Sequence, residues 1–111
     1  MPSEFVDKVL SAAESFPWIT RTEENTVGKV AKVRLWLNGA FVDVYHNSET
    51  GSTSYAYIES GTRLFGANNM KIGWHIHPFG DDTTHEPSDP ISIEAFLAML
   101  EQRLRDTGKI T

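Results

Sequence analysis

The chain contains no cysteine, and this absence limits the chemistry that it can perform. Disulfides, zinc sites with thiolate ligands and cysteine nucleophiles are excluded, so any metal ion must be bound by His, Asp or Glu. No apolar run approaches the ~20 residues that cross a bilayer, and the amino terminus lacks a signal-peptide core. We therefore expect a cytoplasmic protein that does not enter a membrane.

Basic residues are also scarce. Ten Lys and Arg stand against fifteen Asp and Glu, which gives a formal net charge of −5. This balance disfavours a broad electrostatic surface for nucleic-acid phosphates, although it leaves room for a local basic patch. Hydrophobic residues, by contrast, make up 40% of the 111 positions. We expect a single domain, residues 1–111, with a hydrophobic core of its own.

Two amphipathic helices are predicted, one near each end of the chain. Apolar residues at 3.6-residue spacing predict a helix from about Ser3 to Phe16, which Pro17 ends. The same periodicity predicts a second helix that ends near Asp106. This helix begins at Pro90 with Asp89 as its cap, or it follows Ser92 as its cap, and the sequence leaves both starts open.

A β-hairpin is predicted between Lys29 and His46, because Asn38-Gly39 is typical of a two-residue type I′ turn. Such a turn places Arg34 opposite Asp43 and Trp36 opposite Phe41. One face is then wholly apolar and is predicted to be core: Val33, Leu35, Leu37, Ala40, Val42 and Val44. The other face carries Trp36 and Phe41, and we expect a loop, a helix or a partner to cover these rings.

Further strands are predicted to follow this hairpin. Thr53–Ile58 and Thr62–Phe65 form a second hairpin around Ser60-Gly61, Lys71–His77 forms another strand, and Gly80–Asp89 forms a polar loop. The predicted fold class is therefore α+β. It contains an antiparallel sheet of about five strands, with the N-terminal and C-terminal helices packed on its apolar face.

Three of the four histidines fall between positions 75 and 85. In a strand, alternation puts His75 and His77 on one face, roughly 6 to 7 Å apart, with Trp74 and Ile76 on the other. One use of this cluster is a zinc, manganese or iron site made by His75, His77 and His85, with Glu86 or Asp81 as a fourth ligand. Alternatively, the histidines are half-exposed strand residues that hydrogen-bond to loop carbonyls.

A second use of the histidines is acid–base catalysis without a metal. A pair such as His75 and His77 can take and give a proton, as the cleavage of RNA through its own 2′-hydroxyl requires. Arg63, Arg34 or Lys71 would then stabilise the charged transition state, although each of these cations could equally belong to a solvated strand face.

Several residues are candidates for binding rather than catalysis. Arg34, Trp36 and Tyr57 are predicted to contact a ligand or a partner. Tyr45, Tyr55 and Tyr57 could stack on nucleic-acid bases, although tyrosines in a sheet more often pack on their neighbours. A third reading is a non-catalytic interaction module or homodimer that docks through the face carrying Trp36 and Phe41.

Two family resemblances bear on these alternatives. The segment Gly73–Pro78 is similar to the His-x-His-Pro segment of JAMM zinc metalloproteases. The spacing and order of Ser88-Asp89 do not match that family, however, and Glu59, the upstream glutamate, falls at a predicted turn. The stretch from Val33 to Leu104 resembles the TumE-type toxins of prokaryotic toxin–antitoxin modules. The matching pieces are Tyr55-Ala56-Tyr57, Arg63-Leu64-Phe65, Asn68-Asn69, Trp74–Pro78, His85 and the helix Ile91–Leu104.

The resemblance to the TumE-type toxins has clear implications. It implies a toxin-like cytoplasmic protein that is paired with an antitoxin, and it is compatible with a ribonuclease or another hydrolase. The chain departs from the family pattern at Asn68, where an Asp-Asn pair is expected, and in the spacing of its histidines. The reaction therefore has to be inferred from the site itself.

Overall fold

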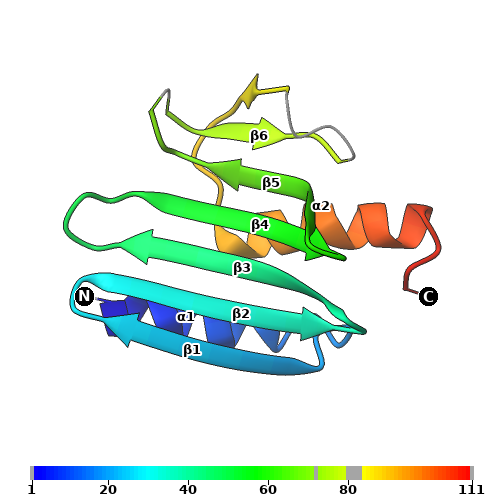
Figure 1. Ribbon diagram of the computed structural model, residues 1–111, viewed down its shortest axis with the longest axis horizontal. Coiled ribbons are helices and arrows are strands. Elements are labelled where there is room, and N and C mark those ends of the chain that lie inside the picture. Colours follow the sequence, from blue (N-terminus) through cyan, green and yellow to red (C-terminus); the bar gives the residue numbers. More distant parts are fainter. Residues whose placement is uncertain (1, 72, 80–83, 111) are drawn as a thin grey trace.

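The computed structural model describes residues 2–71, 73–79 and 84–110, which form an antiparallel sheet and two helices. The strands follow one another in the order β1 to β7, and each is hydrogen-bonded to the next. Both helices lie on the same side of this open sheet, and its other face is left without a helix (Figure 1). The elements are α1 (Pro2–Ala13), β1 (Arg21–Val27), β2 (Val30–Leu37), β3 (Ala40–Asn47), β4 (Thr53–Glu59), β5 (Thr62–Asn68), β6 (His75–His77), β7 (Glu86–Pro87) and α2 (Ile93–Asp106).

The predicted α+β class is confirmed, but the sheet has seven strands in the described residues rather than about five. The two additional strands lie at its edges. All seven residues of β1 are exposed, so this strand has no buried side chains to give it an alternating apolar pattern. β7 contains only two residues, one of them a proline, and is too short for any periodicity. The strand predicted from Lys71 is also shorter, since β6 begins at His75.

The hairpin of β2 and β3 has the predicted register. Asn38 and Gly39 have φ angles of 38° and 82°, as a type I′ turn requires, and Arg34 lies opposite Asp43. The predicted core face is buried along its whole length, with Leu35 and Val42 fully enclosed. Glu59 lies opposite Thr62, so the second predicted hairpin also turns at Ser60-Gly61. The two turns fix which face of each strand meets the helices.

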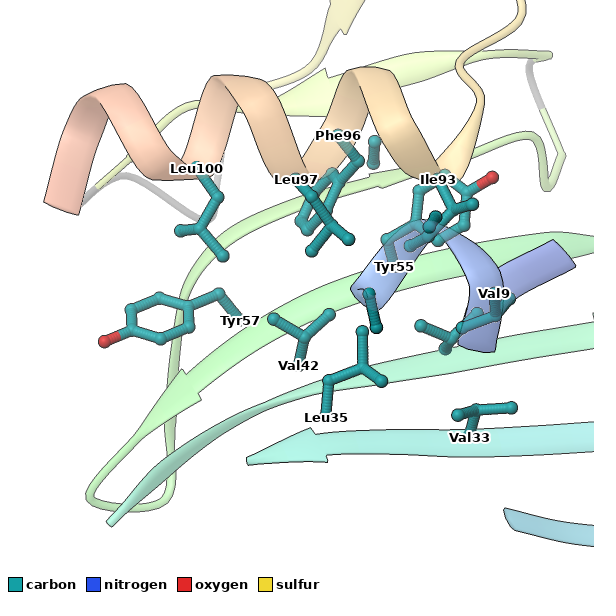
Figure 2. Packing of buried hydrophobic residues seen from close by; sticks show 14 of the residues in the cluster. Val9, Val33, Leu35, Val42, Tyr55, Tyr57, Ile93, Phe96, Leu97 and Leu100 are labelled. Carbon is teal, nitrogen blue, oxygen red and sulfur yellow. The ribbon is translucent and has the colours of Figure 1, made fainter. Parts of the chain in front are cut away.

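The core lies between the sheet and the two helices. Figure 2 shows α2 over the central strands, with Phe96, Leu97 and Leu100 directed toward Val42 and Tyr57. Ser92 is the cap of α2, because its hydroxyl accepts a hydrogen bond from the Ala95 amide at 3.1 Å. The other helix, α1, ends at Ala13, three residues before its predicted end.

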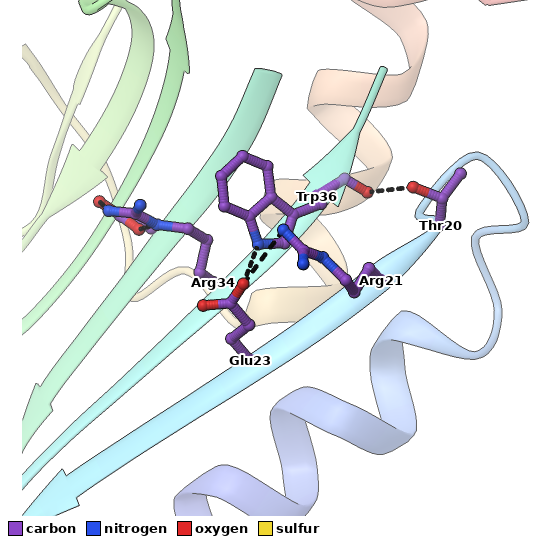
Figure 3. A network of polar contacts seen from close by, with 6 residues as sticks. Thr20, Arg21, Glu23, Arg34 and Trp36 are labelled. Carbon is purple, nitrogen blue, oxygen red and sulfur yellow. Dashed lines mark hydrogen bonds and ion pairs between the residues drawn. The ribbon is translucent and has the colours of Figure 1, made fainter. Parts of the chain in front are cut away.

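The aromatic pair Trp36 and Phe41 lies on the face of the sheet without helices, and arginine side chains of the same chain cover part of it. The Arg21 guanidinium lies 4.7 Å from the centre of the Trp36 ring, and that of Arg34 lies 3.9 Å from the centre of the Phe41 ring. Glu23 accepts a 2.9 Å hydrogen bond from the Trp36 indole (Figure 3). Within the described residues the predicted cover is therefore neither a loop nor a helix.

Tyr57, predicted to bind a ligand, instead belongs to the core. Its side chain is 1% exposed and its hydroxyl donates to Glu59 at 2.7 Å. Lys109, beyond α2, donates to the same carboxylate at 2.8 Å. Alternation explains this position in the core, because Tyr57 lies opposite Val42 and therefore faces the helices. The Lys109 ammonium fastens the C-terminal segment to the hairpin of β4 and β5, and the Tyr57 hydroxyl holds the Glu59 carboxylate in place.

This fastening gives the first testable prediction. The hydrogen bonds from Lys109 and Tyr57 lower the pKa of Glu59, so its stabilising contribution is present at neutral pH and is lost as the pH falls through the folded-state pKa. We expect Lys109→Met to reduce the unfolding free energy by about 0.5 to 1 kcal/mol at pH 7 and by less at about pH 3. Urea unfolding at both pH values measures this, with Lys8→Met on α1 as the control. An equal loss at both pH values would contradict the prediction.

Candidate functional site

Three histidines converge on the face of the sheet without helices. The rings of His75 and His77 have their centres 5.0 Å apart, and the His85 ring lies 5.0 Å from the first and 4.5 Å from the second. One nitrogen of each ring lies within 4.8 Å of the chosen nitrogens of the other two. His75, His77 and His85 therefore form one cluster, although up to ten positions of the sequence separate them, and we call it the histidine cluster.

The pairing of β7 with β6 explains how His85 reaches the other two. Ile76 lies opposite Glu86 and His75 lies opposite Pro87, so the same register places His85 next to His77. Consecutive residues of a strand point to opposite faces. Glu86, predicted as a metal ligand, accordingly lies on the other side with Ile76 and Met99, and it is not among the residues brought together. The other predicted fourth ligand, Asp81, lies outside the described residues.

The predicted faces of β6 are confirmed, because Ile76 pairs with the core residue Ala67. His75 and His77 are each only 4% exposed, which contradicts the alternative reading of them as half-exposed strand residues. Neighbouring side chains from β5 and the ring of His85 cover them, while His85 itself remains exposed. The cluster is therefore buried at His75 and His77 and open to solvent at His85.

His75 has a defined tautomer. Its Nδ1 lies 2.8 Å from the Gly73 carbonyl oxygen, which can only accept a hydrogen bond, so the neutral ring carries its proton on Nδ1. Gly73 has a φ of 84°, a conformation that suits glycine and helps to turn this carbonyl toward the ring. Nε2 of His75 is then the nitrogen with a lone pair for a metal ion or a proton.

His77 lies between two donors. Its Nδ1 is 3.4 Å from a guanidinium nitrogen of Arg63, and its Nε2 is 3.5 Å from the amide nitrogen of Asn68. The orientation of the Asn68 amide is fixed because its oxygen accepts a hydrogen bond from the Met70 amide at 3.0 Å. A neutral imidazole can accept from only one of the two donors, so these contacts do not fix which nitrogen of His77 carries the proton.

A β-bulge places Arg63 beside His77. Simple alternation would put Arg63 and Phe65 on the same face, but Ile58 pairs with Arg63 while Tyr57 pairs with Phe65, so the register shifts at Leu64. Phe65 therefore enters the core and Arg63 lies on the opposite face. Gly66 leaves space for the side chain of Arg63, because a Cβ at this glycine would lie 3.2 Å from the Arg63 Cδ.

The histidine cluster lines a shallow depression of about 270 Å³. Asn68, Met70 and the exposed Lys71 complete its lining. Lys71, one of the cations predicted to stabilise a transition state, therefore lies at the site. The described lining contains imidazole, amide and ammonium groups, which are suited to an anionic ligand.

The other predicted residues lie elsewhere. Arg34 and Trp36 share the face of the histidine cluster but belong to β2, several strands away, and Arg34 forms a two-bond ion pair with Asp43 at 2.7 and 3.0 Å. Tyr55, like Tyr57, is buried in the core. The fourth histidine, His46, stacks on Phe5 at 4.3 Å, and burial lowers its pKa. These residues do not join the cluster.

Sequence reasoning missed the supporting roles of Gly66, Gly73 and Asn68. Asn68 lies near His77 only through the pairing of β5 with β6, and no pattern in the sequence around it predicts that contact. Glycines next to candidate ligands were the one available signal, because they permit close approaches and unusual backbone angles.

Comparisons of the chain with models of protein families, with curated proteins and with solved structures give no match. In the part of the chain that the structure describes, neither helix has the length and apolar character needed to span a membrane. The geometry of the histidine cluster is thus the main basis for inferring a function.

Proposed function

We propose that this protein is a metal-dependent hydrolase whose divalent ion is bound by His75, His77 and His85. The observation that carries the proposal is the convergence of three imidazoles, with one nitrogen from each within 4.8 Å of the others. Three protein ligands and one position left for water are typical of catalytic zinc sites, and imidazole also suits iron.

The residues present fit such an ion after a small closure. Two nitrogens bound to tetrahedral zinc at ~2.0 to 2.1 Å lie about 3.4 Å apart, closer than the present upper limit of 4.8 Å. His75 and His77 are buried and held in β6, whereas His85 is exposed and precedes a two-residue strand. We expect His85 to make most of the movement. The Gly73 carbonyl already orients His75 as metal-binding histidines are commonly oriented.

The chain supplies the remaining parts of a hydrolytic site. A bound ion would lower the pKa of a coordinated water molecule and thus supply a nucleophile near neutral pH. Arg63, which lies 3.4 Å from His77, and Lys71, in the lining of the same depression, would stabilise negative charge on a substrate oxygen. Asn68 would add an amide donor. These groups favour a substrate with a phosphoryl or carboxylate oxygen.

The resemblance to the TumE-type toxins supports a more specific form of this proposal. It favours RNA as the substrate and an antitoxin protein as the partner. A metal-free ribonuclease is the second candidate. The tautomer of His75 favours it, because the free Nε2 of this ring can accept a proton. The centre of the His77 ring, which could act as the second acid–base group, lies 5.0 Å from the centre of the His75 ring. The two candidates differ in whether activity requires an ion.

Elemental analysis of protein purified without a nickel column tests the proposal. We expect about one zinc, manganese or iron ion per chain, or, for a metal-free preparation, an increase in melting temperature when one of these ions is added. Metal-free protein that gains no stability from any of the three would overturn it. Activity that persists after complete removal of the metal by a chelator would favour the metal-free candidate instead.

A further inference from the structure

The face of the sheet that carries the histidine cluster is continuous from β2 to β6. One row of directly paired residues crosses it and ends at the cluster: Lys32, Tyr45, Ser54, Asn68 and His75. Directly paired residues of a sheet share a face. The row therefore joins an exposed ammonium group to the site through an aromatic ring and two short polar side chains, over roughly 19 Å at four strand spacings.

The charge of this face is opposite to that of the whole chain. We assign a described residue to this face when strand pairing places it there or when it lines the depression at the histidine cluster. Five of the assigned residues are cations and two are carboxylates, so the face has a formal charge of +3, whereas the whole chain has a formal charge of −5. The cations are Arg21, Lys32, Arg34, Arg63 and Lys71, and the carboxylates are Glu23 and Asp43. Glu24 is paired with Val33, a core residue, so alternation directs it to the other side, but it also lines the hollow that contains Lys32 and Tyr45. Counting it would lower the formal charge of the face from +3 to +2, which is still opposite to that of the chain.

The two carboxylates are already engaged by neighbours. Asp43 is bonded to Arg34, and Glu23 accepts from Trp36 and lies 3.1 Å from an Arg21 nitrogen (Figure 3). Neither carboxylate lies in the row from Lys32 to His75. An anion that approaches this row therefore meets Lys32 at one end and Lys71 beside the histidines at the other.

We infer that single-stranded RNA binds along this row, with its phosphates near Lys32 and Lys71 and a base on the ring of Tyr45. This inference rests on the proposed function, for which it specifies a single-stranded substrate and the surface along which it binds. Charge complementarity favours a polyanion, and a row of about 19 Å from Lys32 to the histidines suits an extended strand better than a small phosphate ester. A half-exposed tyrosine between cations is the arrangement by which proteins stack single-stranded bases.

Fluorescence anisotropy with a labelled single-stranded RNA of twelve nucleotides of mixed sequence tests the inference. The His75→Ala variant without metal is used, so that binding is measured without cleavage. We expect Lys32→Glu to weaken binding about tenfold, Lys32→Glu combined with Lys71→Glu to weaken it further, and both to reduce its salt dependence. Tyr45→Ala should weaken binding several-fold at every salt concentration.

Lys8→Glu is the matched control, because Lys8 is exposed on α1, on the side of the sheet that the helices cover. RNA binding that responds equally to Lys8→Glu and Lys32→Glu would overturn the inference. So would equal competition by polyglutamate, since that result would indicate an acidic protein as the ligand. The failure of the proposed function can be distinguished from the failure of this inference. If the protein binds RNA through Lys32 but binds no metal, only the metal-dependent hydrolase is overturned. If it binds metal but no RNA, only this inference is overturned.

Discussion

Replacing His75, His77 or His85 with alanine is expected to weaken zinc binding by at least about a hundredfold. Each residue supplies one of the three nitrogens that converge within 4.8 Å, and two imidazoles alone leave the ion with weak chelation. The effect of His85→Ala is the most informative. Its side chain is exposed, so the substitution removes a ligand without opening a cavity in the fold.

Competition with a chromogenic chelator measures these affinities, and thermal unfolding without metal reports the folding of each variant. His46→Ala is the matched control, because His46 contacts Phe5 and Thr53 rather than the cluster. It should bind zinc as the unmodified chain does. A His85→Ala variant with unchanged affinity would rule out the three-histidine centre, and unchanged affinity in all three variants would place the ion elsewhere.

Much of this site could be predicted from local sequence patterns. Alternation along β6 placed His75 and His77 on the face away from Ile76, and the Asn38-Gly39 turn fixed the register of β2 and β3. Both predictions depend on the geometry of one strand or one turn. Such short-range geometry is written in residue types and spacing.

The rest depended on contacts between strands, which residue types did not reveal. The bulge at Leu64 reverses the face of Arg63, yet Arg63-Leu64-Phe65 reads as an ordinary alternating strand. The pairing of β7 with β6 folds His85 over the cluster, but two residues are too few for a pattern. For the same reason Glu86 was grouped with His85, although adjacent strand residues point to opposite faces.

Replacing Arg63 with alanine is expected to reduce the rate of the proposed hydrolysis by about 10² to 10³-fold while zinc affinity changes little. Arg63 lies 3.4 Å from His77. In the proposed reaction its guanidinium would stabilise charge on the substrate but would not bind the ion. Arg63→Lys should recover only part of the rate, because an ammonium cannot reproduce the planar, two-bond contact of a guanidinium. Loss of zinc binding in Arg63→Ala would instead indicate a structural role.

Gly66→Ala should reduce the same rate by displacing Arg63. The new Cβ would lie 3.1 Å from the Tyr55 carbonyl oxygen and 3.2 Å from the Arg63 Cδ, and the side chain can move more easily than the backbone. A double-mutant cycle measures whether Gly66 acts through Arg63. In the Arg63→Ala background, Gly66→Ala should cause little further loss of kcat/KM per folded molecule. If Gly66→Ala reduced kcat/KM by the same factor in the Arg63→Ala background as in the unmodified chain, the glycine would act independently of the arginine.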